Sequence, residues 1–250
     1  MEIKMSIVAE AAGYIQVFSD GTVKRFSPEI ATPSSESSNG YISKDVVIDP
    51  SKPITARIFL PHVPESSTQL PVLVYFHGGG FCIGSTTWLG YHIFLGDLSV
   101  RAKTIVLSVD YRLSPENKLP IAYDDCYSAL EWLHVNRCIE PWLQRADLKR
   151  VSLSGDSAGG NIAHQVAIKA IKNLSDAEWC QFPAVVVYVA GLDFLKERGV
   201  TYAEFLRNKG VKRVELVEAK GESHVYHVFH PESEATSLLQ EQMSDFLQNL

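Results

Sequence analysis

One serine stands between two glycines at the point where an apolar run meets a segment with helical spacing. Residues 154–160 read SGDSAGG, so Gly155 and Gly159 flank Ser157 in the pattern G-x-S-x-G. Glycines two positions before and after a serine leave room for a tight strand-to-helix turn that exposes the serine hydroxyl. The helix that follows points its N-terminal N–H groups toward the reaction. The pattern is common by chance, but the strand before it and the helix after it favour a nucleophilic serine.

A second glycine-rich stretch, HGGGF at 77–81, directly follows the apolar run PVLVYF. Three consecutive glycines let the backbone approach a ligand closely and turn N–H groups toward it, as a loop that stabilises an oxyanion requires. We predict that the backbone N–H groups of Gly78 and Gly79 form an oxyanion hole together with that of Ala158. The alternative is a flexible glycine turn, which the order of strand, HGGG, further strands and G-x-S-x-G makes the weaker interpretation.

Short apolar strands alternate with helical patterns around both stretches. The apolar runs are rich in β-branched residues, which is typical of strands buried on both faces. We expect strands at 44–49, 56–61, 71–76, 104–111, 150–157, 184–191 and 214–219, and helices at 122–136, 158–171, 200–210 and 233–250. This alternation predicts an α/β fold with a mostly parallel central sheet and helices on both faces.

Composition and charge narrow the possible partners. The chain has 250 residues, of which 46% are apolar, and a formal net charge of −6 without any Lys/Arg-rich run. This argues against nucleic acid or an anionic membrane surface as the partner. The four cysteines form no C-x-x-C pair, no stretch of about 18 apolar residues occurs, and no uninterrupted apolar segment precedes Glu10. We therefore expect a cytosolic protein without a zinc site, disulfide framework, membrane span or secretion signal.

The motifs together resemble one known family. HGGGF, YRLSPE at 111–116 and GDSAGGN at 155–161 are similar to the hormone-sensitive-lipase-like branch of the α/β hydrolases. The phrases IQVFSDGTVKRF, SKDVVIDPSKPITARIFLP and YVAGLDFLKERG resemble the plant carboxylesterases of that branch more closely. This resemblance covers nearly the whole chain. It implies a single α/β-hydrolase domain over 1–250, in which 1–40 form an N-terminal cap or lid segment.

The resemblance also implies that a carboxylate and then a histidine follow the serine along the chain. Asp193 comes at the end of the expected strand 184–191, where functional side chains of parallel sheets gather. Its rivals are Asp176, which lies in a polar linker, and Asp245, which lies on the exposed face of the last helix. We therefore predict that Asp193 orients the catalytic base.

Three histidines compete for the role of base. His224, His227 and His230 are spaced by three, which could suggest a metal site, but no carboxylate or cysteine at ligand spacing accompanies them. His224 is the first histidine after the expected strand 214–219, and it matches the Gly-x-x-His-x-Phe/Tyr-His pattern of the family. We assign His224 as the base, His227 as a packed or supporting residue and His230 as a surface residue.

These residues predict a serine carboxylesterase that hydrolyses small to medium carboxylic esters through an acyl-enzyme, with no metal or organic cofactor. Its partner would be a small-molecule ester. Two alternatives stay open: a dehydratase or cyclase of plant specialised metabolism on the same scaffold, and a small-molecule hormone receptor-like binder. The receptor of this branch has lost the catalytic histidine, so His224 argues against the second. Neither the physiological ester nor the oligomeric state can be read from the sequence.

One part of the family's fold is not found in the sequence. Only 35 residues separate Ser157 from Asp193. Related hydrolases place a complete strand and helical cap residues there, so we predict that a strand-plus-cap unit is missing near 170–183. One explanation is that the chain lacks this central strand, which would leave unpaired sheet edges in the core. The other is that residues of the protein are left out of the sequence here and the numbering continues across the gap. We favour the second, because the loss of a central strand should prevent folding.

Overall fold

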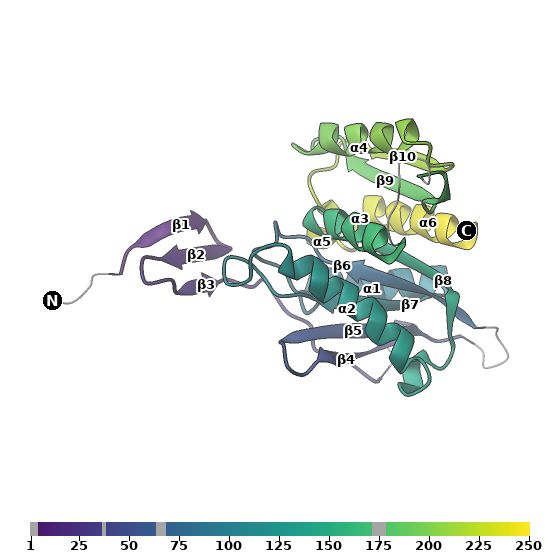
Figure 1. Cartoon of the computed structure of the whole chain (residues 1–250), viewed down its shortest axis with the longest axis horizontal. Helices are drawn as coiled ribbons and strands as arrows, with labels where there is room; N and C mark the ends of the chain where they lie inside the picture. Colours follow the sequence, from purple (N-terminus) through teal and green to yellow (C-terminus); the bar gives the residue numbers. More distant parts are fainter. Residues whose placement is uncertain (1–4, 37–38, 64–68, 172–178) are drawn as a thin grey trace.

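The largest sheet of the molecule has five strands. The computed structural model describes residues 5–36, 39–63, 69–171 and 179–250 (Figure 1). The five strands are β4 Tyr41–Asp49, β5 Ile54–Pro61, β6 Leu70–Phe76, β7 Ile105–Asp110 and β8 Ala146–Gly155. Their spatial order is β4-β5-β7-β6-β8. Strand β6 pairs in parallel with β7 and β8, whereas β5 pairs antiparallel with β4 and β7, so the sheet is mixed.

Helices cover both faces of this sheet. They are α1 Leu89–Ala102, α2 Ile121–Asn136, α3 Ala158–Ile171 and α6 Glu234–Gln248. Successive side chains of a strand point to opposite faces, and β6 therefore contributes to two cores. Val72, Val74 and Phe76 pack in a cluster with residues of α2 and α3, whereas Leu73 and Tyr75 pack in another with residues of α1 and α6. No helix in the described ranges is long and apolar enough to cross a membrane.

A second, two-stranded sheet carries the C-terminal half of the candidate site. It is formed by β9 Val185–Ala190 and β10 Val214–Ala219, which are parallel. Helix α4 Lys196–Asn208, the short helix α5 Tyr226–Phe229 and the 3-10 turn η2 Trp179–Gln181 belong to this part of the chain. A further 3-10 turn, η1 Pro141–Leu143, precedes β8 and packs in the core of the five-stranded sheet. Helix α4 begins four residues before its predicted start, because the carbonyl oxygen of Asp193 accepts the N–H of Lys196 and initiates the first turn there.

Strands β8 and β9 are both sheet edges in the part of the chain that the structure describes. Strand β8 pairs only with β6, and β9 pairs only with β10. Val151 of β8 is 37% exposed, which is unusual for a valine in the middle of an α/β sheet. Such open edges are expected if a strand is missing near 170–183. Residues 172–178 of that stretch lie outside the described residues, so the missing strand-plus-cap unit remains a prediction.

The N-terminal segment forms a small sheet of its own. Strands β1 Ile7–Ala11, β2 Ile15–Phe18 and β3 Val23–Arg25 are antiparallel, and Figure 1 shows them extending away from the rest of the fold. Arg25 fastens this sheet by donating to the carbonyl oxygens of Cys82 (2.7 Å) and Ser114 (2.8 Å) and by pairing with Glu116. The sheet is thus attached to the loop that follows the HGGG stretch. Its role as a cap or lid stays a prediction.

Candidate active site

The turn between β8 and α3 holds Ser157 in a strained backbone conformation. Its φ angle is +52°, in the left-handed region that non-glycine residues rarely adopt. The two glycines of the motif make the turn possible. A Cβ at Gly159 would overlap the carbonyl oxygen of Phe76, and a Cβ at Gly155 would overlap the backbone of Gly159. The turn therefore packs directly against the end of β6, and the residue between the glycines points its hydroxyl away from the sheet.

Ser157, His224 and Asp193 lie in one hydrogen-bonded line. The Nε2 atom of His224 is 2.9 Å from Ser157 Oγ, and its Nδ1 atom is 2.6 Å from Asp193 Oδ2. The other carboxylate oxygen of Asp193 accepts the backbone N–H of Leu195 at 2.7 Å, which fixes the carboxylate. A carboxylate next to Nδ1 keeps the proton on that nitrogen, so Nε2 is free to accept the serine proton. The serine comes from the five-stranded sheet, and the other two residues come from loops of the β9–β10 sheet.

The other two histidines of the GESHVYHVFHP stretch point elsewhere. His227 is buried, its ring lies 4.6 Å from the ring of Phe94, and its Nε2 makes a long contact of 3.4 Å with the hydroxyl of Tyr75. Burial lowers the pKa of His227, so its ring is neutral. His230 is exposed. Among the described residues, no group of three or more His, Cys, Asp or Glu side chains is arranged to hold a metal ion.

The HGGG loop presents free backbone N–H groups. Gly79 and Gly80 have φ angles of +100° and +60°, which favour glycine, and a Cβ at Gly79 would overlap the carbonyl group of Ile83. Within the described ranges, the N–H groups of Gly79, Gly80 and Ala158 have no hydrogen-bond acceptor. Consecutive free N–H groups of this kind form a concavity that binds anions. Gly79 and Ala158 therefore have N–H groups available, and so does Gly80, but their place in an oxyanion hole stays a prediction.

Gly78 departs from the prediction. Its N–H is already engaged, because it donates to the hydroxyl of Tyr91 at 2.9 Å and to Asp156 Oδ1 at 3.1 Å. A donor with two acceptors beneath the loop cannot also serve an oxyanion above it. Gly78 is therefore an attachment point of the loop and not part of the proposed hole. The run of glycines in the sequence gives no sign of which N–H faces inward.

Asp156, the neighbour of Ser157, is the acceptor at the centre of a buried cluster. Its Oδ1 accepts the hydroxyl of Tyr75 at 2.8 Å, and its Oδ2 accepts the hydroxyl of Tyr91 at 2.9 Å. Burial, followed by the negative charge of Asp156, raises the pKa of both tyrosines well above the usual value, so both hydroxyls stay protonated. Asp156 also bonds the backbone of the HGGG turn, through the N–H of Gly78. The two tyrosines are not anticipated from the sequence.

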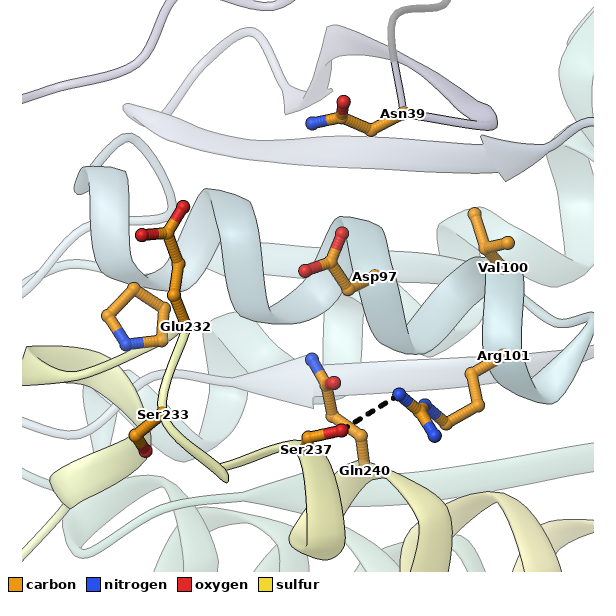
Figure 2. Close-up of a pocket in the computed structure, with 9 residues that line it drawn as sticks. Asn39, Asp97, Val100, Arg101, Glu232, Ser233, Ser237 and Gln240 are labelled. Carbon is orange, nitrogen blue, oxygen red and sulfur yellow. Dashed lines mark hydrogen bonds between the residues drawn. The ribbon is translucent and has the colours of Figure 1, made fainter. Parts of the chain in front are cut away.

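A cavity of about 570 Å³ lies away from this site. It opens between α1 and the residues that precede and begin α6 (Figure 2). Two carboxylates, Asp97 and Glu232, line it, together with Arg101, which donates a hydrogen bond to Ser237 at 3.0 Å. Burial raises the pKa of Asp97. None of the residues predicted from the motifs lines this cavity, so it has no part in the arrangement around Ser157.

Comparison with known proteins identifies the family. A family model described as alpha/beta hydrolase fold matches residues 73–178 and 171–228, which is more than half of the chain. The chain belongs to the α/β-hydrolase family. The two matched pieces of the hydrolase meet at 171–178, inside the stretch where the missing unit is predicted.

Curated relatives match part of this hydrolase chain. Probable carboxylesterase 6 of Arabidopsis thaliana is 46% identical over 166 residues, which are 65% of this chain and 49% of that protein. Tuliposide A-converting enzyme 2, chloroplastic, of Tulipa gesneriana is 42% identical over 175 residues, which are 68% of this chain and 43% of that enzyme. The chain thus spans about half the length of the curated relatives it matches.

Solved structures share the hydrolase fold over most of its length. Carboxyl esterase 2 from the mycorrhizal fungus Tuber melanosporum superimposes with a TM-score of 0.73 at 20% identity, covering 89% of this chain and 91% of that one. The Pyrobaculum calidifontis esterase has a TM-score of 0.70 at 25% identity, covering 87% and 86%. The fold expected from the sequence is therefore confirmed.

Proposed function

We propose that this α/β hydrolase is a serine carboxylesterase that acts on small to medium carboxylic esters. The observation that carries the proposal is the line from Ser157 Oγ through the imidazole of His224 to the carboxylate of Asp193, with distances of 2.9 and 2.6 Å. A serine hydroxyl is a weak nucleophile unless a base lies within hydrogen-bond reach and a third group orients that base. Both conditions are met here, by His224 as the base and Asp193 as the group that orients it. Relatives named as carboxylesterases support the same activity.

In the proposed mechanism, Ser157 Oγ attacks the ester carbonyl carbon while His224 Nε2 takes its proton. Asp193 accepts the Nδ1–H and stabilises the imidazolium. The N–H groups of Gly79, Gly80 and Ala158 stabilise the oxyanion. When the tetrahedral intermediate collapses, the bond to the alkoxy oxygen breaks and His224 donates its proton to the leaving alcohol. Water then attacks the acyl-enzyme with His224 again as the base, which releases the acid and restores Ser157.

The proposal is tested by ester turnover. We expect the protein to hydrolyse p-nitrophenyl acetate and the Ser157→Ala variant to lose that activity. A panel of p-nitrophenyl esters of increasing acyl length, with kcat/KM for each, would then define the accepted acyl group. Hydrolysis that persists in Ser157→Ala at the wild-type rate would contradict the serine mechanism.

A second candidate is a conversion that does not end in hydrolysis. It is favoured by relatives named tuliposide A-converting enzymes, which are 42% identical over 175 residues. A dehydratase or cyclase on this scaffold would use the same base with a different fate for the substrate. Turnover in ¹⁸O-labelled water distinguishes the two, because hydrolysis of the acyl-enzyme places one labelled oxygen in the acid product and a non-hydrolytic conversion does not. A cytosolic location and a small-molecule ester as partner stay predictions.

A further inference from the structure

The loop between β9 and α4 carries an apolar side chain that has no cover. Phe194 directly follows Asp193, and it is 81% exposed; Leu192, on the other side of Asp193, is 72% exposed. A phenylalanine that exposes most of its surface loses the free energy of burial, and exposed apolar groups that cluster in one place mark binding sites. Here the exposed pair flanks the carboxylate of the proposed catalytic line.

The position of Phe194 is fixed by the same hydrogen bonds that hold Asp193. The N–H of Leu192 donates to the carbonyl oxygen of Glu222 at 2.9 Å, which ties this loop to the loop that carries His224. The N–H of Leu195 donates to Asp193 Oδ1 at 2.7 Å. The centroid of the Phe194 ring lies 5.1 Å from that of His224, with the ring planes at 48°. The aromatic ring is thus in contact with the imidazole and still open to solvent.

The chemistry of the proposed reaction determines which part of the ester lies beside the Phe194 ring. The oxygen of the leaving alcohol must receive its proton from His224 Nε2, so that oxygen lies within hydrogen-bond distance of the imidazole. The substituent on that oxygen extends along the surface that borders His224. The acyl substituent is attached to the carbonyl carbon and leaves the site in another direction. The side chain beside the imidazole therefore meets the alcohol part of an ester first.

We propose that Phe194 is a specificity-determining residue that binds the alcohol part of the substrate, and that it selects esters of aromatic or other apolar alcohols. The inference rests on the proposed esterase function. An aromatic group of the alcohol stacks on the open face of Phe194, which gives an attraction beyond simple burial. Because the contact involves only the leaving group, it acts on formation of the acyl-enzyme and not on its hydrolysis.

Two acetate esters test the proposal. Ethyl acetate and 2-phenylethyl acetate share the acyl group and have alcohols of similar acidity, so they differ mainly in the aromatic ring. We expect Phe194→Ala to lower kcat/KM for 2-phenylethyl acetate by about tenfold and to change kcat/KM for ethyl acetate by less than about twofold. Phe194→Tyr, which keeps an aromatic face, should restore the preference. Phe229→Ala removes another exposed phenylalanine, which is 50% exposed, and it serves as the matched control.

A third ester distinguishes binding of the alcohol part from binding of the acyl part. Ethyl phenylacetate carries its ring on the acyl group, and its kcat/KM should be unchanged in Phe194→Ala. Equal losses on all three esters, or a loss confined to ethyl phenylacetate, would overturn the assignment of Phe194 to the alcohol. Wild-type protein that turns over none of the esters in a Ser157-dependent manner would instead overturn the proposed esterase function, and the assignment with it.

Discussion

The two sides of the candidate site are built in different ways. On the nucleophile side, Ser157 and the HGGG loop rest on the buried carboxylate of Asp156 and belong to the five-stranded sheet. On the acid–base side, Asp193 and His224 belong to loops of a two-stranded sheet, and the neighbouring Phe194 is largely exposed. The difference indicates that the first side is fixed by buried polar contacts, whereas the second has room to bind substrate.

Polar contacts near Ser157 join the two sides. His224 reaches Ser157, and three residues later His227 reaches the hydroxyl of Tyr75, which itself donates to Asp156. Apolar side chains of α1 and α6 pack in one cluster with Tyr75, on one face of the five-stranded sheet. Changes on the acid–base side should therefore alter activity with little effect on folding, whereas changes beneath the HGGG loop should affect both.

The largest expected effect is on turnover. Ser157→Ala and His224→Ala should each lower kcat by about 10³-fold or more, and the double variant should lose hardly more, because the members of such a triad act as one unit. His227→Ala should lose far less, since the imidazole that reaches Ser157 Oγ is that of His224, whereas Nε2 of His227 faces Tyr75. Steady-state hydrolysis of p-nitrophenyl acetate measures all three, with the exposed His230→Ala as control. Equal losses in His224→Ala and His227→Ala would show that the base is wrongly assigned.

A second prediction separates the two carboxylates of the candidate site, Asp156 and Asp193. Asp156→Ala leaves the hydroxyls of Tyr75 and Tyr91 without their buried acceptor and removes one of the two acceptors of the Gly78 N–H, so the free energy of unfolding should fall by about 3 kcal/mol or more. Asp193→Ala should lower it by about 1 kcal/mol, while kcat falls by about 10³-fold or more. Urea denaturation measures the first quantity. Equal losses of stability would contradict the contrast between the two sides.

The three predicted residues that the structure brings together share one property. Ser157, Asp193 and His224 each follow a strand that is recognisable from its apolar run, and the carboxyl ends of parallel strands converge on one edge. The chain order of the three residues comes from the resemblance to the family. Local pattern and family order together select three side chains that lie within hydrogen-bond distance of one another in the structure.

What the sequence could not provide depends on contacts between distant segments. Tyr75 reads as one more apolar residue of a buried strand, although a buried tyrosine hydroxyl needs a partner and could have been questioned for that reason. Tyr91 lies in an apolar helix with nothing nearby in the chain to suggest Asp156. Gly78 was placed in the oxyanion hole because a glycine run does not reveal the direction of each N–H. The open edges of β8 and β9 follow from pairing, which no single strand encodes.

A smaller effect on stability and kcat should distinguish Tyr91, on the nucleophile side, from Tyr202, on the acid–base side. Tyr91→Phe removes a hydroxyl that links Gly78 to Asp156, so we expect the free energy of unfolding to fall by about 1–2 kcal/mol and kcat to fall severalfold as the HGGG loop loosens. Tyr202→Phe removes a hydroxyl 2.9 Å from His164 Nδ1, far from the loop, and should reduce stability slightly without changing kcat. Thermal unfolding and turnover of one ester test both. A drop in kcat for Tyr202→Phe alone would reverse the comparison.

The last expected effect is on the pH dependence of stability, on the nucleophile side of the molecule. Burial, and then the charge of Arg57, lower the pKa of His92 from 6.5 to about 4. Since the unfolded chain binds a proton at His92 more readily than the folded one, this group leaves stability unchanged above about pH 6.5 and reduces it as the pH falls toward about 4. His92→Gln removes the titration. The loss of unfolding free energy between about pH 7 and about pH 5 should therefore be smaller in His92→Gln than in the wild type, as measured by urea denaturation at both values. An equal loss in the two proteins would mean that His92 gains a proton as easily in the folded state as in the unfolded one, and that the contact with Arg57 does not keep the ring neutral.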